Sequence, residues 1–91
     1  NVFPRELEDA LIDHPDISDV VVTGVDDPKF GQVLAAYVVV KDGKSLSEDD
    51  VKTYAKEHVA RYAVPGKTMF LDELPRNPTG KVMKRELPEF E

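Results

Sequence analysis

The feature that most constrains the fold of this chain is residues 31–40, which end in Ala-Ala-Tyr-Val-Val-Val without a polar residue. β-Branched and aromatic residues at this density favour a strand over a helix. A strand that is apolar on both faces is buried on both faces, as the central strand of a sheet is. We therefore predict a central strand over residues 31–40.

Two further segments are predicted strands that can flank the central one. Residues 17–25 are rich in β-branched side chains, and residues 67–71 are predicted to form a short third strand. The turn sequence Asp26-Asp27-Pro28 separates the first of these from the central strand. We expect the two longer strands to form a hairpin, with residues 26–32 as a long connection of the kind that carries function.

Two helices are predicted, one on each side of this hairpin in the sequence. The first begins at Pro4, where the missing N–H of proline costs nothing, and ends before Pro15. The second follows Ser47, an N-cap residue with three carboxylates after it, and its apolar residues keep helical spacing as far as Tyr62. His58 falls on this apolar stripe and is interpreted as a satisfied core or boundary residue, not as a ligand.

The predicted order of elements is α-β-β-α-β-loop-α, with a last short helix within residues 82–87 that Pro88 ends. This order belongs to the α+β class, as a small, mostly antiparallel sheet flanked by helices. The 91 residues are enough for one domain with one core.

Composition and charge exclude several classes of function. The net charge of −6 argues against nucleic acid, which selects basic surfaces. The chain has no cysteine and only two, widely separated histidines, so neither a disulfide nor a metal site is expected. No apolar run approaches the roughly 20 residues of a membrane span, so we expect no transmembrane segment. The absence of cysteine fits the cytoplasmic location that we expect. The first residue is Asn1 and not Met, from which we expect the chain to be a piece of a longer protein.

A basic segment near the C-terminus differs from this acidic background. Of the 12 basic and 18 acidic residues in the chain, four basic and no acidic residue fall within residues 76–85. The sequence at residues 74–81 is Leu-Pro-Arg-Asn-Pro-Thr-Gly-Lys, whose prolines and glycine exclude a helix or a central strand. We predict a shaped loop that presents an amine where an anion can meet it.

The Gly80-Lys81 pair does not form a phosphate-binding P-loop. That motif requires a glycine separated by four residues from the Gly-Lys pair, where Pro75 stands, and a serine or threonine after the lysine, where Val82 stands. For an arbitrary Gly-Lys pair, a solvated basic surface loop is the simpler interpretation.

The whole segment 74–82, however, resembles the C-terminal lysine motif of the adenylate-forming enzymes, which is written as Pro, four residues, Gly-Lys. This family includes acyl-CoA synthetases, 4-coumarate-CoA ligases, luciferases and non-ribosomal peptide adenylation domains. Residues 1–8 resemble the segment just after the interdomain hinge of the family. Further motifs match at residues 31–32 and 36–39, with glutamine for the usual glutamate, and at residues 62–65, with alanine for the usual lysine. These two departures, at Gln32 and Ala63, put surface or interface contacts of the family in doubt, but they do not affect the proposed chemistry of the lysine motif.

The resemblance implies roles for the residues of the loop. Lys81 would be the catalytic cation that bridges a carboxylate oxygen and the α-phosphate region of ATP. Asn77 would hold the loop geometry through local hydrogen bonds. The residues that would shape the loop are Pro75, Pro78, Thr79 and Gly80. The residues that would attract nucleotide or CoA phosphates are Arg76, Lys84 and Arg85. For these three, a role as ordinary solvated surface residues is an equally good interpretation.

The resemblance also implies that residues 1–91 are the mobile C-terminal domain of an AMP-forming acid–thiol ligase. Such an enzyme converts a carboxylate and ATP to an acyl-adenylate and then to acyl-CoA, and a fatty acid is the expected substrate. The N-terminal domain, with the sites for ATP, Mg²⁺ and the acyl group, is absent from this sequence, so this domain by itself is expected to be inactive and to hold no cofactor. Its expected partners are that N-terminal domain, the acid, ATP and CoA.

A second hypothesis needs no catalysis. An α-β-β-α-β order is also similar to half of a ferredoxin-like fold, so the chain could be a small regulatory or ligand-binding module. Such a module would carry glycine-rich loops at its strand ends, whereas this sequence concentrates its unusual residues in one lysine loop.

Overall fold

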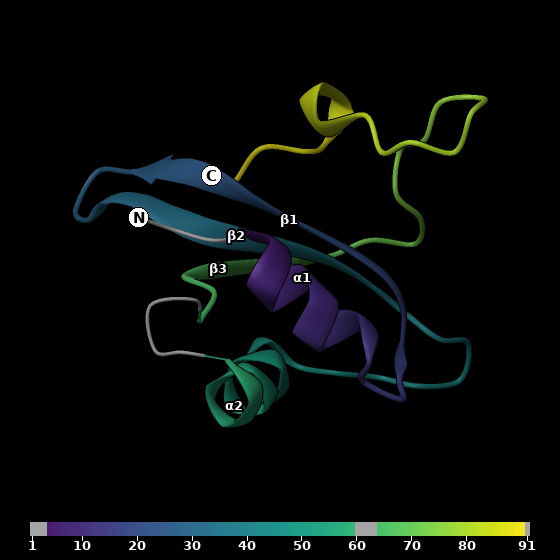
Figure 1. Cartoon of the computed structure of the whole chain (residues 1–91), viewed down its shortest axis with the longest axis horizontal. Coiled ribbons are helices and arrows are strands. Elements are labelled where there is room, and N and C mark those ends of the chain that lie inside the picture. Colours follow the sequence, from purple (N-terminus) through teal and green to yellow (C-terminus); the bar gives the residue numbers. More distant parts are fainter. Residues whose placement is uncertain (1–3, 60–63, 91) are drawn as a thin grey trace.

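A computed structural model describes residues 4–59 and 64–90 of the chain. The elements are α1 (Pro4–Ile12), β1 (Ile17–Asp27), β2 (Gly31–Val40), α2 (Glu48–His58), β3 (Lys67–Phe70) and a 3₁₀ turn, η2 (Lys84–Glu86). The structure confirms the predicted α+β class and the order of its elements (Figure 1). The predicted last helix is present only as the single turn η2.

The sheet has the order β1-β2-β3, so the apolar strand β2 lies at its centre as predicted. β1 pairs with β2 antiparallel over ten residue pairs, whereas β3 pairs with β2 parallel over four. The sheet is therefore mixed, with most of its pairing antiparallel. A parallel neighbour requires a crossover connection, and α2 supplies it between β2 and β3.

The predicted long connection at residues 26–32 is wrong. Asp26 pairs with Gln32 and Asp27 with Gly31, so β1 continues to Asp27 and only Pro28–Phe30 remain as the connection. The Asp27 carboxylate accepts the backbone N–H groups of Lys29 at 2.8 Å and Phe30 at 3.0 Å. These hydrogen bonds lower the pKa of Asp27 below its ordinary value. The aspartate shapes a tight hairpin turn, which is a structural role.

The start of α2 follows the prediction, and its end does not. The Ser47 hydroxyl accepts the N–H of Asp50, and the Asp50 carboxylate accepts the N–H of Ser47, which together form a capping box. The helix ends at His58, because Val59 is already extended, with φ −131°. Val59 still packs against the core, so its apolar character reflects packing and not continued helix. Tyr62 and Ala63 lie outside the described residues.

His58 is exposed, which corrects its interpretation as a core or boundary residue. It lies in the last turn of α2, where its Nδ1 is 2.8 Å from the carbonyl oxygen of Tyr54. Its ring also stacks on the Tyr54 ring, with the two centroids 4.0 Å apart. The side chain is thus satisfied locally, at the surface.

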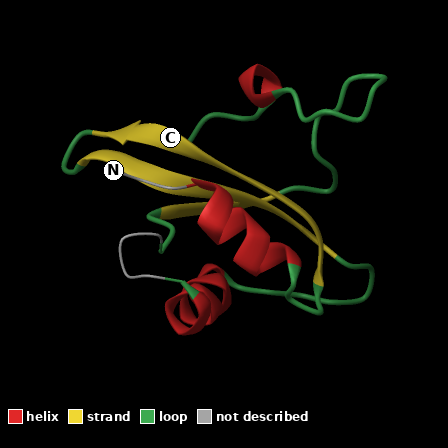
Figure 2. Ribbon diagram, viewed as in Figure 1, coloured by secondary structure: helices red, strands yellow, loops and turns green. Residues whose placement is uncertain are grey.

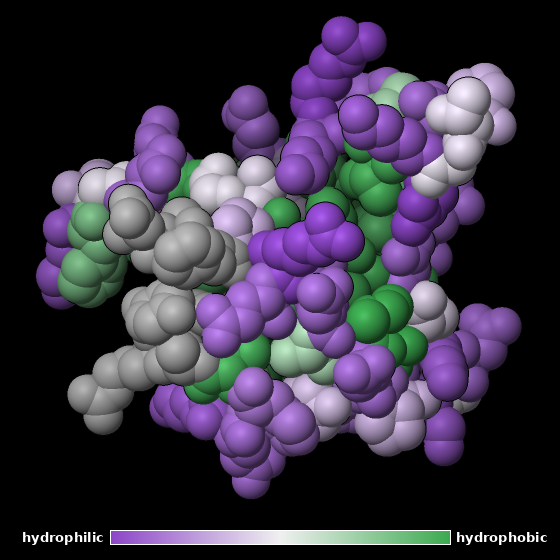
Figure 3. All heavy atoms as spheres, viewed as in Figure 1, coloured by the Kyte–Doolittle hydropathy of each residue, from purple (hydrophilic) through white to green (hydrophobic). Residues whose placement is uncertain are grey.

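Two apolar clusters cover the two faces of the sheet. Helices α1 and α2 lie on one face, which we call the helix face (Figure 2), where they pack against alternate side chains of β1 and β2. On the other, the tail face, the chain after β3 covers the sheet without any α-helix. The view in Figure 3 shows polar side chains over most of the visible surface, with small apolar areas between them. Among the described residues, no helix is long and apolar enough to cross a membrane.

Candidate functional site

The candidate site is residues 76–82, which we call the lysine loop. It projects from the tail face as the green-to-yellow segment before η2 (Figure 1). Leu74 before it and Leu87 after it are buried in the tail-face cluster, so the sheet holds both ends. A single antiparallel bridge joins Arg76 to Val82 and closes the loop at its base. The loop is therefore a small hairpin outside the sheet.

The tip of the lysine loop is a tight turn. Gly80 N–H donates to the carbonyl oxygen of Asn77 at 2.9 Å, which defines a β-turn with Pro78 and Thr79 at its centre. Proline is well suited to the first central position of such a turn, because its φ is fixed near the required value. Gly80 has a φ of 90°, in the left-handed region that favours glycine.

The Asn77 side chain stabilises this turn by hydrogen bonds. Its Oδ1 accepts three hydrogen bonds: from Thr79 N–H at 3.1 Å, from the Thr79 hydroxyl at 2.7 Å and from Lys81 N–H at 3.0 Å. In addition, Asn77 N–H donates to the carbonyl oxygen of Lys81 at 2.9 Å. The backbone of Lys81 is thus held on both its N–H and its carbonyl side. Pro75 contributes its carbonyl oxygen, which accepts Met83 N–H at 2.7 Å.

Arg76 connects β1 to the tip turn of the lysine loop. Its Nη2 lies 2.7 and 2.8 Å from the two carboxylate oxygens of Asp19, and its Nε also donates to this carboxylate at 3.3 Å. Its Nη1 donates to the carbonyl oxygen of Gly80. The guanidinium predicted to attract phosphates is therefore already engaged by a carboxylate and a carbonyl. Its attraction for phosphate stays a prediction.

Asp19 is the site residue that the sequence did not indicate. It lies 57 positions before Arg76, and one aspartate among many acidic residues carries no local signal of such a pair. Only the fold brings the two together.

The three remaining basic residues lie together. Lys81, Lys84 and Arg85 are exposed and line one shallow hollow with Asn77, Val82 and Met83. No ion pair involves any of the three within residues 4–59 and 64–90. The Lys81 ammonium thus lies at the end of a long side chain, on a fixed backbone, with two further cations nearby. Such a group can stabilise an anion that is brought to it.

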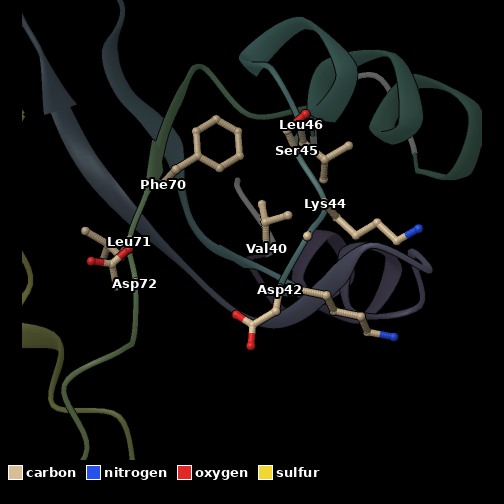
Figure 4. Close-up of a pocket in the computed structure, with 10 residues that line it drawn as sticks. Val40, Asp42, Lys44, Ser45, Leu46, Phe70, Leu71 and Asp72 are labelled. Carbon is tan, nitrogen blue, oxygen red and sulfur yellow. The ribbon is translucent and has the colours of Figure 1, made fainter.

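Another hollow lies between the β2–α2 connection and the end of β3, and shares no residue with the lysine loop (Figure 4). Val40, Leu46 and Phe70 form its apolar part, and the side chain of Lys44 extends away from it. Its polar lining comes from Lys41, Asp42, Lys44, Ser45 and Asp72. In the described part of the chain there is no group of three histidine or carboxylate side chains that could hold a metal ion.

The fold and the lysine loop define a small domain that presents one cation from a rigid turn. The chain belongs to the family of AMP-binding enzyme C-terminal domains, whose model matches residues 6–81. It is 44% identical over 87 residues to the 2-succinylbenzoate–CoA ligase of Geobacillus kaustophilus, with 96% of this chain and 18% of that protein covered.

Solved structures agree with this assignment. The Mycobacterium tuberculosis fatty acyl CoA synthetase superposes with a TM-score of 0.85 at 41% identity, over 93% of this chain and 17% of that one. The ATP-bound MatB of Rhodopseudomonas palustris gives a TM-score of 0.86 at 34% identity, again over 93% and 17%. The chain thus spans less than a fifth of the proteins that it matches.

Proposed function

We propose that this chain is the mobile C-terminal domain of an ATP-dependent, AMP-forming acid–thiol ligase, and that Lys81 is its adenylation lysine. The observation that carries the proposal is the exposed Lys81 side chain on a backbone fixed by Asn77. The family match and the similarity to CoA ligases support it.

The proposed chemistry needs a cation of this kind. Attack of a carboxylate on the α-phosphate of ATP joins two anions, and the transition state spreads negative charge over phosphoryl oxygens. A cation that is already oriented stabilises this charge without reorganisation. The Lys81 ammonium, with three N–H donors, would contact one oxygen of the acid and one of the α-phosphate. Lys84 and Arg85, on the same hollow, would raise the local concentration of the anionic substrates.

The second half-reaction would use the domain differently. After pyrophosphate leaves, a thiol loses its proton and attacks the acyl carbonyl, and AMP departs with the bonding electron pair on its phosphate oxygen. Charge in this step develops at the acyl carbonyl and the leaving phosphate, and we propose that Lys81 does not contact it. We propose that the domain rotates as a rigid body between the two steps. The hydrogen bonds that hold the lysine loop, within the loop and to Asp19 on β1, would move with the domain in such a rotation.

The acid, the nucleotide and its Mg²⁺ would bind mainly to the N-terminal domain of the longer protein. We propose a fatty acid as the substrate and CoA as the acceptor, as the name of the M. tuberculosis structure suggests by similarity. The G. kaustophilus relative is named for an aryl acid, so aryl acids are the direct competitors in a substrate panel. The family match does not favour the non-catalytic ferredoxin-like module.

The test uses the full-length protein that contains this chain. It is incubated with Mg²⁺, ATP, CoA and a panel of fatty and aryl acids, and AMP, ADP, pyrophosphate and acyl-CoA are measured. The proposal expects one AMP and one pyrophosphate for each acyl-CoA, with the highest kcat/KM for a fatty acid. ADP as the product, or no acid-dependent turnover with any acid, would exclude this function.

A further inference from the structure

We infer that Asp19 and Arg76 are positioning residues for Lys81, and that Arg76 acts through its shape and not through its charge. The inference rests on the proposed function, since it assigns residues that orient the adenylation lysine. Neither side chain needs to touch a substrate for this role.

The first step of the argument is how Asp19 reaches the tail face. Ile17 lies in the helix-face cluster, and strand residues two positions apart normally share a face. A β-bulge interrupts the pairing between Ile17 and Asp19, where Ile17 opposes Val40 and Asp19 opposes Val39. The extra residue, Ser18, shifts the alternation, so Asp19 shares the tail face with Val21. The bulge thus turns a carboxylate toward the lysine loop.

The second step is the geometry of the pair. Both Asp19 oxygens lie within 2.8 Å of Arg76 Nη2, and Asp19 Oδ1 also accepts Val20 N–H at 3.0 Å. The Arg76 and Asp19 side chains are 41% and 29% exposed, so the pair is partly shielded from water. A guanidinium held in this way has a fixed orientation, which an isolated surface ion pair does not have.

The third step is what the other side of the guanidinium does. Arg76 Nη1 donates to the carbonyl oxygen of Gly80, the residue directly before Lys81. Gly80 has a positive φ and no side chain, and its N–H already donates to Asn77. Its carbonyl oxygen is therefore the group through which Arg76 links it to β1. A continuous path therefore runs from β1 through Asp19 and Arg76 to the peptide bond that precedes the proposed catalytic lysine. A misplacement of about 1 Å at a reacting group can cost up to 100-fold in rate, so this path is expected to matter for adenylation.

The test separates shape from charge in the full-length protein. Arg76→Lys keeps the positive charge but cannot span Asp19 and the Gly80 carbonyl with one planar group. We expect Arg76→Lys and Asp19→Asn each to slow acid-dependent ATP–pyrophosphate exchange about tenfold. Conversion of supplied acyl-adenylate to thioester should stay within about twofold of wild type, because Lys81 is not used in that step. The double variant should be no slower than the slower single variant, since both break one path.

Hydrogen exchange gives a readout that does not depend on activity. Peptides that contain residues 77–82 should exchange faster in both variants, while peptides from β2 should not change. The matched control is Asp9→Asn, which removes one carboxylate from the exposed Arg5–Asp9 pair on α1, 4.0 Å apart. It should leave both half-reactions and the loop peptides at wild-type values.

Any other outcome contradicts either this inference or the proposed role of Lys81 on which it rests. Full adenylation in Arg76→Lys would show that charge is sufficient, and loss in Arg76→Lys with none in Asp19→Asn would show that Arg76 acts without its partner. If the rate losses of the two single variants multiply in the double variant, the two residues act independently and the inference is wrong. A parallel Lys81→Ala variant distinguishes the two failures. If its adenylation is intact, the proposed role of Lys81 is wrong. If its adenylation is lost while the pair variants stay active, only the present inference is wrong.

Discussion

The two faces of the sheet are built by different means. Among the residues that the structure describes, ten are buried between regular elements on the helix face: Leu7, Leu11, Ile17, Val20, Val22, Leu34, Ala36, Val38, Val51 and Ala55. Six of the described residues are buried under irregular chain on the tail face: Val21, Ala35, Tyr37, Val39, Leu74 and Leu87. The helices satisfy their own backbone, whereas the lysine loop depends on the side chains of Asn77 and Arg76. The comparison indicates that the helix face supplies most of the buried core and that the tail face carries the candidate site.

The largest predicted effect on stability is at the centre of the helix face. Leu7 is fully buried between α1 and the sheet. Leu7→Ala removes buried methyl groups and leaves a cavity, so we expect a loss of about 3 kcal/mol in the free energy of unfolding. Urea unfolding followed by circular dichroism measures it. A loss below about 1 kcal/mol would mean that this face is not the main core.

The matched change on the tail face should cost less. Leu87 keeps 9% of its surface exposed and lies directly after the 3₁₀ turn η2, outside any α-helix or strand. We expect Leu87→Ala to cost about 1–2 kcal/mol, because the segment around it can partly collapse into the space. The loss should appear first as faster hydrogen exchange in residues 74–90. Equal losses for Leu7→Ala and Leu87→Ala would remove the difference between the two faces.

A good part of the helix face could be predicted from the sequence. The unbroken apolar run of β2 predicted its central place, and Ser47 with its following carboxylates predicted the start of α2. These features follow from local patterns of burial and capping. The end of α2 could not be predicted in this way, because Val59 packs into the core in an extended conformation.

The tail face was predicted less completely. The prolines and Gly80 correctly excluded regular structure from the lysine loop, but its support could not be predicted. The parallel pairing of β3, the bulge at Ser18 and the Asp19–Arg76 pair are long-range results of the fold. A tight turn at Asp27 was also mistaken for a long loop, since turn residues do not reveal how far strand pairing continues.

The smallest predicted effect is a pH dependence shared by two carboxylates. The backbone N–H groups of Lys29 and Phe30 lower the pKa of Asp27 below the ordinary value of 3.8. The backbone N–H of Ser47, and then its side chain, lower the pKa of Asp50 below the same value. The folded state therefore keeps these groups ionised at a pH where the unfolded chain protonates them. Their contribution is present above about pH 4 and is lost as the pH falls through the lowered pKa values.

Thermal unfolding between about pH 2 and pH 5 measures this contribution. We expect the fall in melting temperature on acidification to be shallower in Asp27→Asn and in Asp50→Asn than in wild type. Asp50→Asn reports the capping box on the helix side, and Asp27→Asn reports the hairpin turn. An unchanged slope in both variants would show that these hydrogen bonds do not couple protonation to folding.

The central claim is that the tail face exists to present Lys81, and the two half-reactions of Lys81→Ala in the full-length protein test it most directly. We predict that acyl-adenylate formation falls about 100- to 1000-fold, as for other groups that stabilise transition-state charge. Thioester formation from supplied acyl-adenylate and the melting temperature should stay at wild-type values, and Lys44→Ala, a matched loss of one exposed lysine elsewhere, should change neither step. Equal loss in both half-reactions, or loss in neither, would contradict the account.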